Sequence, residues 1–418
     1  MKIVVIGAGL IGISTAYFLR LRGHDVTVIE REKGPGLQTS FANGALVTPS
    51  MPEPWNAPGC WRLLLASLAR SDAPLQLRLR ALPDLMGWGI QFLRNSNPER
   101  YRESTIRNVR LALSSLSVLQ DLRQQTHIEY GETARGSLKL FRNAEALNDT
   151  LCSADQLLAE GLKLRRLSRD ETIGLEPALS PIADQLAGAI HYAADETGDA
   201  HRFCDALAEH ARQRGVNFSF GTSVSRCEVD SGHIAAVQTD KGHLVAEHYV
   251  VAAGSYSTPV LRPLGFHLPV RPAKGYSVTF DGPRSTSALS IPIVDDDMHA
   301  AVVPVGNAIR VAGTAEFAGF DLTLRPERVR NLTNLAQKIL PKAGLDLTTA
   351  RPWCGLRPMS ADGVPIIGAT PIPNLWLNTG HGHLGWTMAA GSGQLLAELM
   401  SGEIPALDPK PYSLARFG

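Results

Sequence analysis

The sequence predicts an α/β protein with a Rossmann-type dinucleotide-binding domain and an inserted α+β domain built on an antiparallel sheet. Three observations support this prediction. Residues 2–31 follow the order strand, glycine turn, helix, strand and acidic residue. A second glycine-rich segment, at residues 378–393, leads into a helix near the C-terminus. Short apolar runs crowd residues 270–315, a pattern that favours antiparallel strands.

The first element is predicted to be a buried parallel strand. Residues 2–6 form an apolar run rich in β-branched side chains, as such a strand requires. Gly7, Gly9 and Gly12 follow at GxGxxG spacing. In this motif the first glycine permits a sharp turn, the second lets a pyrophosphate approach the backbone, and the third lets helix and strand pack closely. The segment therefore predicts a dinucleotide site.

The next helix and strand complete this motif. The helix starts near Leu10, so its positive N-terminus faces the expected phosphates. Residues 25–29 form a second strand that ends at Glu30, where a carboxylate can bind ribose hydroxyls. A lone GxGxxG is a weak signal, but here the strand, the helix and the acid occur in the expected order.

Composition argues against several other classes of protein. With 41 basic and 40 acidic residues, the chain has no bulk charge for binding nucleic acid. The five cysteines are scattered and form no CxxC pair, which argues against a disulfide framework or a metal site. No apolar run is long enough to span a bilayer, and the strand at residue 2 leaves no room for a signal peptide. We therefore expect a cytoplasmic protein.

The remaining segments predict a nucleotide-binding layer that is interrupted twice. Residues 34–60 form a long Gly/Pro/Ser/Asn-rich loop, and such loops are uncommon unless they bind something. Residues 61–125 are largely helical by pattern, with helix starts at Pro83 and Pro98. Further predicted elements are strands at 136–141, 216–220, 248–252, 271–280, 289–297, 300–305 and 309–314, and helices at 200–214 and 388–400. We assign 1–80, 195–265 and 353–418 to the dinucleotide-binding domain, and 81–194 and 266–352 to a substrate domain.

Six runs of residues establish a family resemblance over nearly the whole chain. They are TSFANGA (39–45), WNAPG (55–59), DETGD (195–199), KGYS (274–277), GLRPMSADGVPIIG (355–368) and NTGHGHLGWTMAAGSGQLLAEL (378–399). With these runs the chain resembles the D-amino-acid-oxidase superfamily of FAD enzymes, and most closely its bacterial D-amino acid dehydrogenase branch. The first and last runs are specific to this branch, whereas GxGxxG is not.

The resemblance implies that FAD lies between the two glycine-rich ends of the chain. The N-terminus of the last helix, near residues 384–387, would face the flavin and stabilise negative charge on the reduced ring. The expected FAD-binding residues are Gly7, Gly9, Leu10, Ile11, Gly12, Glu30, Arg31, Ser40, Asn43, Gly44, Ala45, Leu46, Val224, Ala253, Gly254, Gly382, His383, Leu384, Gly385 and Thr387.

Three side chains are the expected catalytic residues. Arg357 lies in the G-x-R-P run, where the resemblance implies an anchor for the substrate carboxylate. A guanidinium suits this task because its planar fork makes two bonds to a carboxylate and stays charged, although a structural arginine is the competing interpretation. His383 would orient substrate or tune the flavin, and Tyr276 would line the pocket. For these two, simple packing stays open as the alternative.

The resemblance also implies an activity, the FAD-dependent oxidative deamination of D-amino acids by hydride transfer from the α carbon to flavin N5. The electrons would pass to a respiratory-chain or dye acceptor. Three alternatives stay open: a D-proline or D-hydroxyproline dehydrogenase that forms a cyclic imine, a glycine or sarcosine oxidase that uses O2, and a non-catalytic FAD-binding subunit of a hetero-oligomer. Ala301 matches a tyrosine of glycine oxidase, and the smaller side chain favours a bulkier substrate.

Several charged residues have simpler interpretations than catalysis. The acidic run 295–297, with His299 close by, is expected in a solvated turn rather than at a metal. Lys274 and Arg310 lie in the predicted antiparallel sheet. We expect both of these basic side chains to be exposed at the surface, and the alternative is that one of them faces the flavin.

A group of aromatic residues allows two interpretations. Trp55, Trp61, Trp88 and Phe92 lie among Arg and Leu residues in the helical insert. Helices that pack on a core need such side chains, and we expect these four in the core. A patch that docks on a membrane surface is the alternative, because members of the resembling family pass electrons to the respiratory chain. The protein would then be peripheral on the inner face of the cell membrane.

Overall fold

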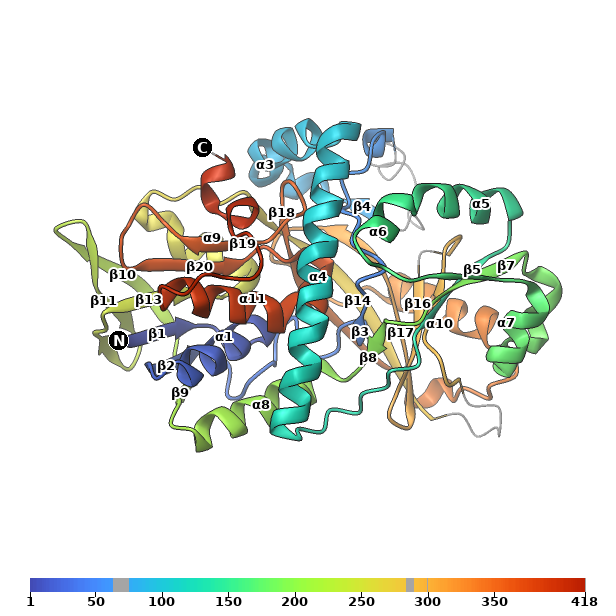
Figure 1. Cartoon of the computed structure of the whole chain (residues 1–418), viewed down its shortest axis with the longest axis horizontal. Helices are drawn as coiled ribbons and strands as arrows, with labels where there is room; N and C mark the ends of the chain where they lie inside the picture. Colours follow the sequence, from blue (N-terminus) through green and yellow to red (C-terminus); the bar gives the residue numbers. More distant parts are fainter. Residues whose placement is uncertain (63–74, 283–288, 299, 418) are drawn as a thin grey trace.

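The computed structural model describes residues 1–62, 75–282, 289–298 and 300–417, and its two halves lie side by side along the long axis (Figure 1). Each half is built on one large sheet, and helix α4 (Pro98–Thr126) stands between them. His299 and residues 63–74 of the predicted helical stretch lie outside the described residues.

The left half in Figure 1 has a six-stranded sheet in the order β19-β20-β13-β1-β2-β9. Its strands are β1 (Lys2–Ile6), β2 (Asp25–Glu30), β9 (Asn217–Phe220), β13 (His248–Val251), β19 (Ile366–Ala369) and β20 (Leu375–Thr379). β1 pairs in parallel with both β2 and β13, and β19 pairs antiparallel with β20. The predicted Rossmann-type order of strands and helix is therefore confirmed.

Different layers cover the two faces of this sheet. One apolar cluster joins the sheet to the helices α1 (Leu10–Leu21), α8 (Ala200–Gln213) and α11 (Gly385–Met400). A second cluster joins it to a three-stranded sheet of β10 (Val224–Asp230), β11 (His233–Thr239) and β12 (Gly242–Leu244). Burial on both faces explains the continuous apolar sequence of β1.

The right half has a sheet in the order β18-β14-β17-β16-β15-β5-β7-β6, with β4 paired to β17. Its strands are β4 (Leu75–Leu77), β5 (Ser137–Phe141), β6 (Arg165–Leu167), β7 (Gly188–Tyr192), β14 (Val270–Asp281), β15 (Ile293–Asp295), β16 (Ala300–Val305), β17 (Ala308–Phe317) and β18 (Arg351–Ser360). Most pairs are antiparallel, and α10 (Pro326–Ile339) packs on one face. The predicted fold class is confirmed.

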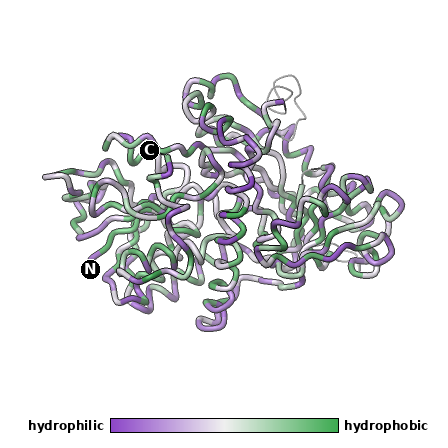
Figure 2. The backbone as a smooth tube through the Cα atoms, turned by 45° about the horizontal axis from the view of Figure 1, so that its top comes forward, coloured by the Kyte–Doolittle hydropathy of each residue, from purple (hydrophilic) through white to green (hydrophobic). Residues whose placement is uncertain are grey.

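Shorter elements complete the chain. They are β3 (Leu46–Val47), paired with β8 (Glu196–Thr197), and the helices α3 (Leu82–Arg94), α5 (Ala144–Ser153), α6 (Asp155–Ala159), α7 (Arg169–Leu175) and α9 (Ser257–Leu261). Apolar stretches run through both halves of the molecule (Figure 2). Within the described ranges, no helix combines the length and the hydropathy needed to cross a bilayer.

Helix α4 contacts the cores of both halves. Leu116 and its neighbours on α4 belong to the apolar cluster around α1 and α11, whereas Val109 packs with β5 and β7. At Gly391 of α11 an added Cβ would lie 2.7 Å from the Cα of Ser115, so the two helices approach closely at this glycine. The α4 helix therefore connects the two halves. The predicted division into domains stays a prediction.

Two expectations about charged residues were wrong, and a third was wrong in part. Lys274 is fully buried because Glu316, its cross-strand partner, neutralises it at 2.9 Å. Arg310 is buried beside Asp199, with Nη2 3.4 Å from a carboxylate oxygen. Asp296 and Asp297 lie in the expected turn, but Asp295 is buried, and Arg142 donates to it at 2.8 Å. Each ion pair depends on residues distant in the sequence, so no local pattern reveals it.

The aromatic group divides into buried and exposed members. Trp88 and Phe92 are buried as expected, and Trp55 packs partly buried against the same cluster. Trp61 is 49% exposed, so its expected place in the core was wrong. The last helix begins at Gly385 rather than at residue 388.

Candidate active site

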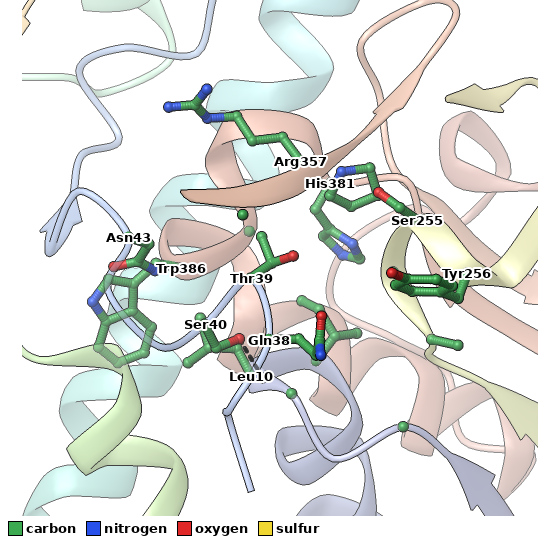
Figure 3. A pocket seen from close by; sticks show the side chains of 18 of the residues that line it. Leu10, Gln38, Thr39, Ser40, Asn43, Ser255, Tyr256, Arg357, His381 and Trp386 are labelled. Carbon is green, nitrogen blue, oxygen red and sulfur yellow. Dashed lines mark hydrogen bonds between the residues drawn. The ribbon is translucent and has the colours of Figure 1, made fainter. Parts of the chain in front are cut away.

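A cavity of about 720 Å³ lies between the two halves, with Leu10 and Gln38 toward one end and Arg357 toward the other (Figure 3). This volume lies within the range of ligand sites in proteins. Predicted site residues that line the cavity are Gly7, Gly9, Leu10, Ile11, Glu30, Arg31, Ser40, Asn43, Gly44, Leu46, Val224, Ala253, Gly254, Tyr276, Arg357, Gly382, His383 and Gly385. Segments from both ends of the chain thus meet at one cavity.

The first glycine turn leaves backbone space at the end of β1. Gly7 has a φ of +109°, which side chains rarely adopt. At Gly12 an added Cβ would lie 1.9 Å from the carbonyl oxygen of Gly7, so helix and turn are in contact. Helix α1 begins at Leu10, whose N–H donates to the Ser40 hydroxyl at 3.2 Å, and Gly9 before it supplies no side-chain cap to the N–H groups that follow. Its N-terminus is therefore available to an anionic ligand such as a pyrophosphate.

Two residues after β2 shape the neighbouring part of the cavity. Glu30 accepts a hydrogen bond from the backbone N–H of Ala8 at 2.8 Å, which fixes its carboxylate beside the glycine turn. The guanidinium of Arg31 lies over the ring of Tyr256, 3.7 Å from its centroid. The turn, the acid and the open helix end fit the dinucleotide part of FAD.

Four predicted cofactor residues are not among those that line the cavity. They are Gly12, Ala45, Leu384 and Thr387, of which the last accepts the N–H of Thr48 at 3.0 Å through its hydroxyl. Ala45 has a φ of +55°, and Thr48 follows in the same loop. These contacts hold the loop after residue 44 against the start of α11.

Arg357 lies at the other end of the cavity, on β18. Its guanidinium lies across Gly275 of β14, where an added Cβ would be 2.2 Å from Nη1. Nη1 donates to the carbonyl of Thr314 at 3.4 Å, and no carboxylate of the described residues pairs with Arg357. Burial lowers the pKa of Arg357 to about 10, so the group is charged at neutral pH. Arg357 is half-buried in the wall of the cavity, and a cation held there without a counter-charge is a binding site for an anion.

A tryptophan and a histidine lie beside this arginine. The rings of Trp55 and His383 stack with centroids 5.6 Å apart, and the Arg357 guanidinium is 5.4 Å from the Trp55 ring. Burial lowers the pKa of His383 to about 4, and repulsion from Arg357 adds to this decrease. A hydrogen bond with the Met51 backbone opposes it. The imidazole is therefore neutral at physiological pH, and Arg357 holds the positive charge of this group.

A bulge in β17 directs one more residue toward Arg357. The pairing of β14 with β17 shifts register beside Gly275, which leaves Thr314 as the extra residue. Its φ of +54° is unusual for a β-branched side chain. The Thr314 hydroxyl is buried and has no hydrogen-bond partner among the described residues.

A buried carboxylate fixes the loop that forms part of the cavity wall. Asp195 accepts hydrogen bonds at 2.5 Å from the hydroxyls of Ser50 and Ser137. Burial raises the pKa of Asp195 to about 7, although the two hydroxyls oppose this rise. The Asp195 contacts join the loop containing Thr48 and Met51, which line the cavity, to β5.

Tyr276, one of the predicted catalytic residues, lies in surroundings that suggest a packing role, and His381 lies nearby on the cavity wall. Side chains alternate along β14, so Tyr276 points to the face opposite Arg357, where its hydroxyl donates to Glu316 at 2.7 Å. His381 is buried, and its Nε2 is 2.9 Å from the Ser392 hydroxyl. The Tyr276 phenol is therefore engaged on the other face of the sheet, whereas His381 lines the cavity and its buried Nδ1 has no hydrogen-bond partner among the described residues.

Sequence reasoning missed three contributors to the site. Trp55 was grouped with core aromatics, although its WNAPG run belongs to the family resemblance. Thr314 had no sequence signal because a bulge depends on the register of two strands. Tyr256 follows the Ala253–Gly254 pair at the end of β13, and this position was a usable signal for a cavity residue.

Comparisons with known sequences agree on one family. Residues 2–399 match the family described as "FAD dependent oxidoreductase" (DAO). A protein from Paramagnetospirillum magneticum named D-amino acid dehydrogenase is 42% identical over 420 residues, which cover 100% of this chain and 99% of that protein. A protein of the same name from Bradyrhizobium diazoefficiens is 40% identical over 417 residues, with the same coverage.

Solved structures share the fold over almost the full length. Glycine oxidase from Geobacillus kaustophilus has a TM-score of 0.76 at 24% identity and covers 99% of each chain. L-proline dehydrogenase from P. horikoshii has a TM-score of 0.78 at 20% identity, over 100% of this chain and 97% of that one. At these identities the likeness concerns the fold alone.

Proposed function

This chain belongs to the DAO family of FAD-dependent oxidoreductases, and we propose that it is a dehydrogenase of D-amino acids. The predicted family and cofactor are confirmed by the match over residues 2–399. The main support for an amino acid substrate is Arg357, a half-buried guanidinium in the wall of the cavity with no carboxylate partner among the described residues. Relatives at about 40% identity that bear the name D-amino acid dehydrogenase support the substrate class.

We assign Arg357 to the substrate carboxylate. Its planar fork binds both carboxylate oxygens, and the buried surroundings strengthen this pairing. Gly275 leaves the space in which the guanidinium lies flat, and the Thr314 carbonyl holds one of its nitrogens. The anchor fixes which face and which hydrogen of the α carbon lie toward the cofactor, and such positioning supplies much of the rate.

The glycine turn, Glu30 and the start of α11 would hold FAD, which when bound would supply the acceptor for the electron pair from the α carbon. The surrounding residues favour the neutral form of the substrate amine. Arg357 is the cation of this group, and the neutral His383 beside it adds no charge. An ammonium group close to Arg357 would be repelled in a buried site, so the reactive free amine is the form that fits.

A cyclic substrate is the second candidate, and small residues in the wall favour it. Ala301 and Ala312 are cross-strand partners on the cavity face of β16 and β17, and both line the cavity beside Gly313. No large side chain at these positions restricts the ring of D-proline or D-hydroxyproline. Oxidation of such a ring gives a cyclic imine, whereas an open-chain product hydrolyses in water.

The acceptor of the electrons is proposed to be a component of the respiratory chain rather than O2. The name dehydrogenase among the relatives supports this choice. Oxygen uptake measured against dye reduction separates the two acceptors, since an amine oxidase consumes O2 at the rate at which it oxidises substrate. A peripheral contact with the membrane would bring the protein to such an acceptor.

An anaerobic bleaching screen tests the proposed function. The purified holoprotein is mixed without oxygen with D- and L-amino acids, including both proline series, and loss of flavin absorbance is followed. Bleaching by D-amino or D-imino acids only is expected. Arg357→Leu should retain FAD but lose nearly all kcat/KM, and Arg357→Lys should recover a fraction. No bleaching by any substrate would instead favour a non-catalytic FAD-binding subunit, and a normal KM in Arg357→Leu would refute the anchor.

A further inference from the structure

Two side chains that line the cavity each keep one buried polar atom without a hydrogen-bond partner among the described residues. They are Asn378, near the end of β20, and His381, which follows this strand. Asn378 is fully buried, and only 3% of His381 is exposed. The atoms concerned are Oδ1 of Asn378 and Nδ1 of His381. Buried polar atoms are normally paired, so these two require an explanation.

Ser392 of α11 holds both side chains. Its carbonyl accepts a hydrogen bond from Nδ2 of Asn378 at 3.1 Å, and its hydroxyl lies 2.9 Å from Nε2 of His381. Nδ2 of Asn378 also donates to the hydroxyl of Thr15 on α1 at 3.0 Å. One edge of each side chain is therefore fixed by the helices, and the opposite edge carries the atom that has no partner.

These contacts determine what each of the two atoms can bind. A carbonyl only accepts, so the bond to Ser392 identifies the amide nitrogen of Asn378 and leaves Oδ1 as an acceptor that needs a donor. Burial lowers the pKa of His381 to about 3, so its ring is neutral and carries one N–H. Nδ1 is then a donor or an acceptor, according to the role that the Ser392 hydroxyl takes at Nε2.

A hydroxyl group suits both atoms, whereas an anionic group does not. A hydroxyl can donate to Oδ1 of Asn378, and it can either donate to Nδ1 of His381 or accept from it. An ionised phosphate or carboxylate only accepts, so it cannot form a hydrogen bond with Oδ1. The chemistry of the two atoms therefore indicates a neutral, hydroxyl-bearing part of a ligand.

The position of His381 along the cavity agrees with this chemistry. His381 lies between Leu10 and Gln38 at one end and Arg357 at the other (Figure 3). The start of α1 at Leu10 suits the pyrophosphate of FAD, and Arg357 is the proposed anchor of the substrate beside the reactive ring. Between its pyrophosphate and its ring, FAD carries the ribityl chain, which is a row of neutral hydroxyl groups.

We propose that Oδ1 of Asn378 and Nδ1 of His381 bind hydroxyl groups of the ribityl chain of FAD. Both side chains are fixed before FAD binds, because Ser392 holds each of them from the side away from these atoms. Groups that are already in place lose little conformational freedom on binding, so their hydrogen bonds add to the affinity for FAD.

This inference rests on the FAD site of the proposed function and deepens it, since it assigns the middle of the cavity to one part of the cofactor. The binding of FAD is measured without substrate and without turnover. Failure of this inference and failure of the proposed activity on D-amino acids are therefore separate results.

Two variants of His381 separate the roles of its two ring nitrogens. The side-chain amide of asparagine reaches the position of Nδ1, whereas the amide of glutamine reaches the position of Nε2. The FAD-loaded proteins are diluted, and the release of FAD is followed by its fluorescence. We expect His381→Gln to raise the dissociation constant of FAD about tenfold, and His381→Asn to stay within about threefold of the original protein.

The matched control is Ser14→Ala. The Ser14 hydroxyl is also buried and has no partner within the described part of the chain, but Ser14 does not line the cavity. It lies where α1 meets Gly393 of α11, so the control alters the same pair of helices. This variant should release FAD like the original protein.

The contrary results are distinct. Equal release of FAD from the two His381 variants would overturn the proposal, and so would tighter binding by His381→Gln than by His381→Asn, because the contact with Ser392 would then be the important one. The absorption bands of the bound flavin should keep their positions. Shifted bands in His381→Gln would assign Nδ1 to the ring, and a raised KM with unchanged release of FAD would assign it to the substrate.

Analogues of FAD that lack single ribityl hydroxyls provide a test that does not depend on how the variants fold. The analogues are exchanged into the original protein, and at least one should bind about tenfold more weakly than FAD. The same analogue should cost His381→Gln little, because the partner of the missing hydroxyl is already absent. Equal affinity of the original protein for FAD and for every analogue would overturn the proposal.

Discussion

The substitution Gly275→Ala tests the placement of Arg357 without changing that residue. Gly275 has no positive φ, so alanine fits the backbone, but its Cβ would lie 2.2 Å from Nη1 and 2.3 Å from Cζ of Arg357. Ordinary contact begins at 3.4 Å, so the guanidinium must move by about 1.2 Å. Because it is the end of a flexible side chain, it can move without unfolding the sheet.

The displacement should weaken catalysis more than folding. A misplacement of about 1 Å can cost about 10²-fold in rate, so we expect kcat/KM for D-amino acids to fall by about that factor, mainly through KM. Steady-state dye reduction measures this change. The flavin content and the melting temperature should stay close to those of the original protein, because the substitution lies away from the glycine turn.

The matched control is Gly87→Ala on helix α3, where an added Cβ meets nothing within 4 Å. This variant should keep the original kcat/KM. A folded, FAD-loaded Gly275→Ala protein whose kcat/KM lies within twofold of the control would refute the view that Arg357 acts from this position.

Three other substitutions probe separate parts of the site. In Gly12→Ala the new Cβ meets the Gly7 carbonyl oxygen at 1.9 Å, so the ratio of flavin to protein after purification should fall severalfold. In Ala301→Tyr the narrower wall should lower kcat/KM for D-proline about tenfold or more, with a smaller effect on glycine. Asp195 has a raised pKa of about 7, so its stabilising effect is complete below about pH 4 and is lost as the pH rises through 7. Asp195→Asn should therefore flatten the decrease in melting temperature between about pH 4 and 7.

Each of these expectations has a clear contrary result. A full flavin complement in Gly12→Ala would show that the turn tolerates a side chain. Equal losses for D-proline and glycine in Ala301→Tyr would show that the wall does not select by size. A pH dependence of melting that is identical with aspartate and asparagine at position 195 would assign the titration to other groups.

Local patterns in the sequence predicted the parts of the fold that depend on local chemistry. The strand at 2–6, the glycine turn and the helix from Leu10 are present because turn geometry and burial act within a few residues. Two distant glycine-rich segments also predicted that both ends of the chain meet at one cavity, as Gly9 and Gly382 do. Resemblance, rather than pattern, identified Arg357.

The unpredicted parts depend on partners far along the chain. Lys274 could be placed inside only with knowledge of Glu316, and Asp295 only with knowledge of Arg142. The stack of Trp55 on His383 joins residues more than 300 positions apart. The exposure of Met86 could not be predicted from the sequence either, because apolar residues in a helix do not by themselves show which face other elements cover.

The alternation of side chains along β14 and β17 has a consequence for how this protein can change. Residues that shape the cavity, such as Ala301 and Ala312, lie on one side of the sheet, whereas Lys274 and Glu316 form their ion pair on the other. Substitutions on the cavity side can therefore change the substrate preference, while the ion pair on the opposite side keeps the domain folded. Mutagenesis libraries restricted to the cavity side should yield many folded variants with altered selectivity, and descendants of this gene could diverge by the same route.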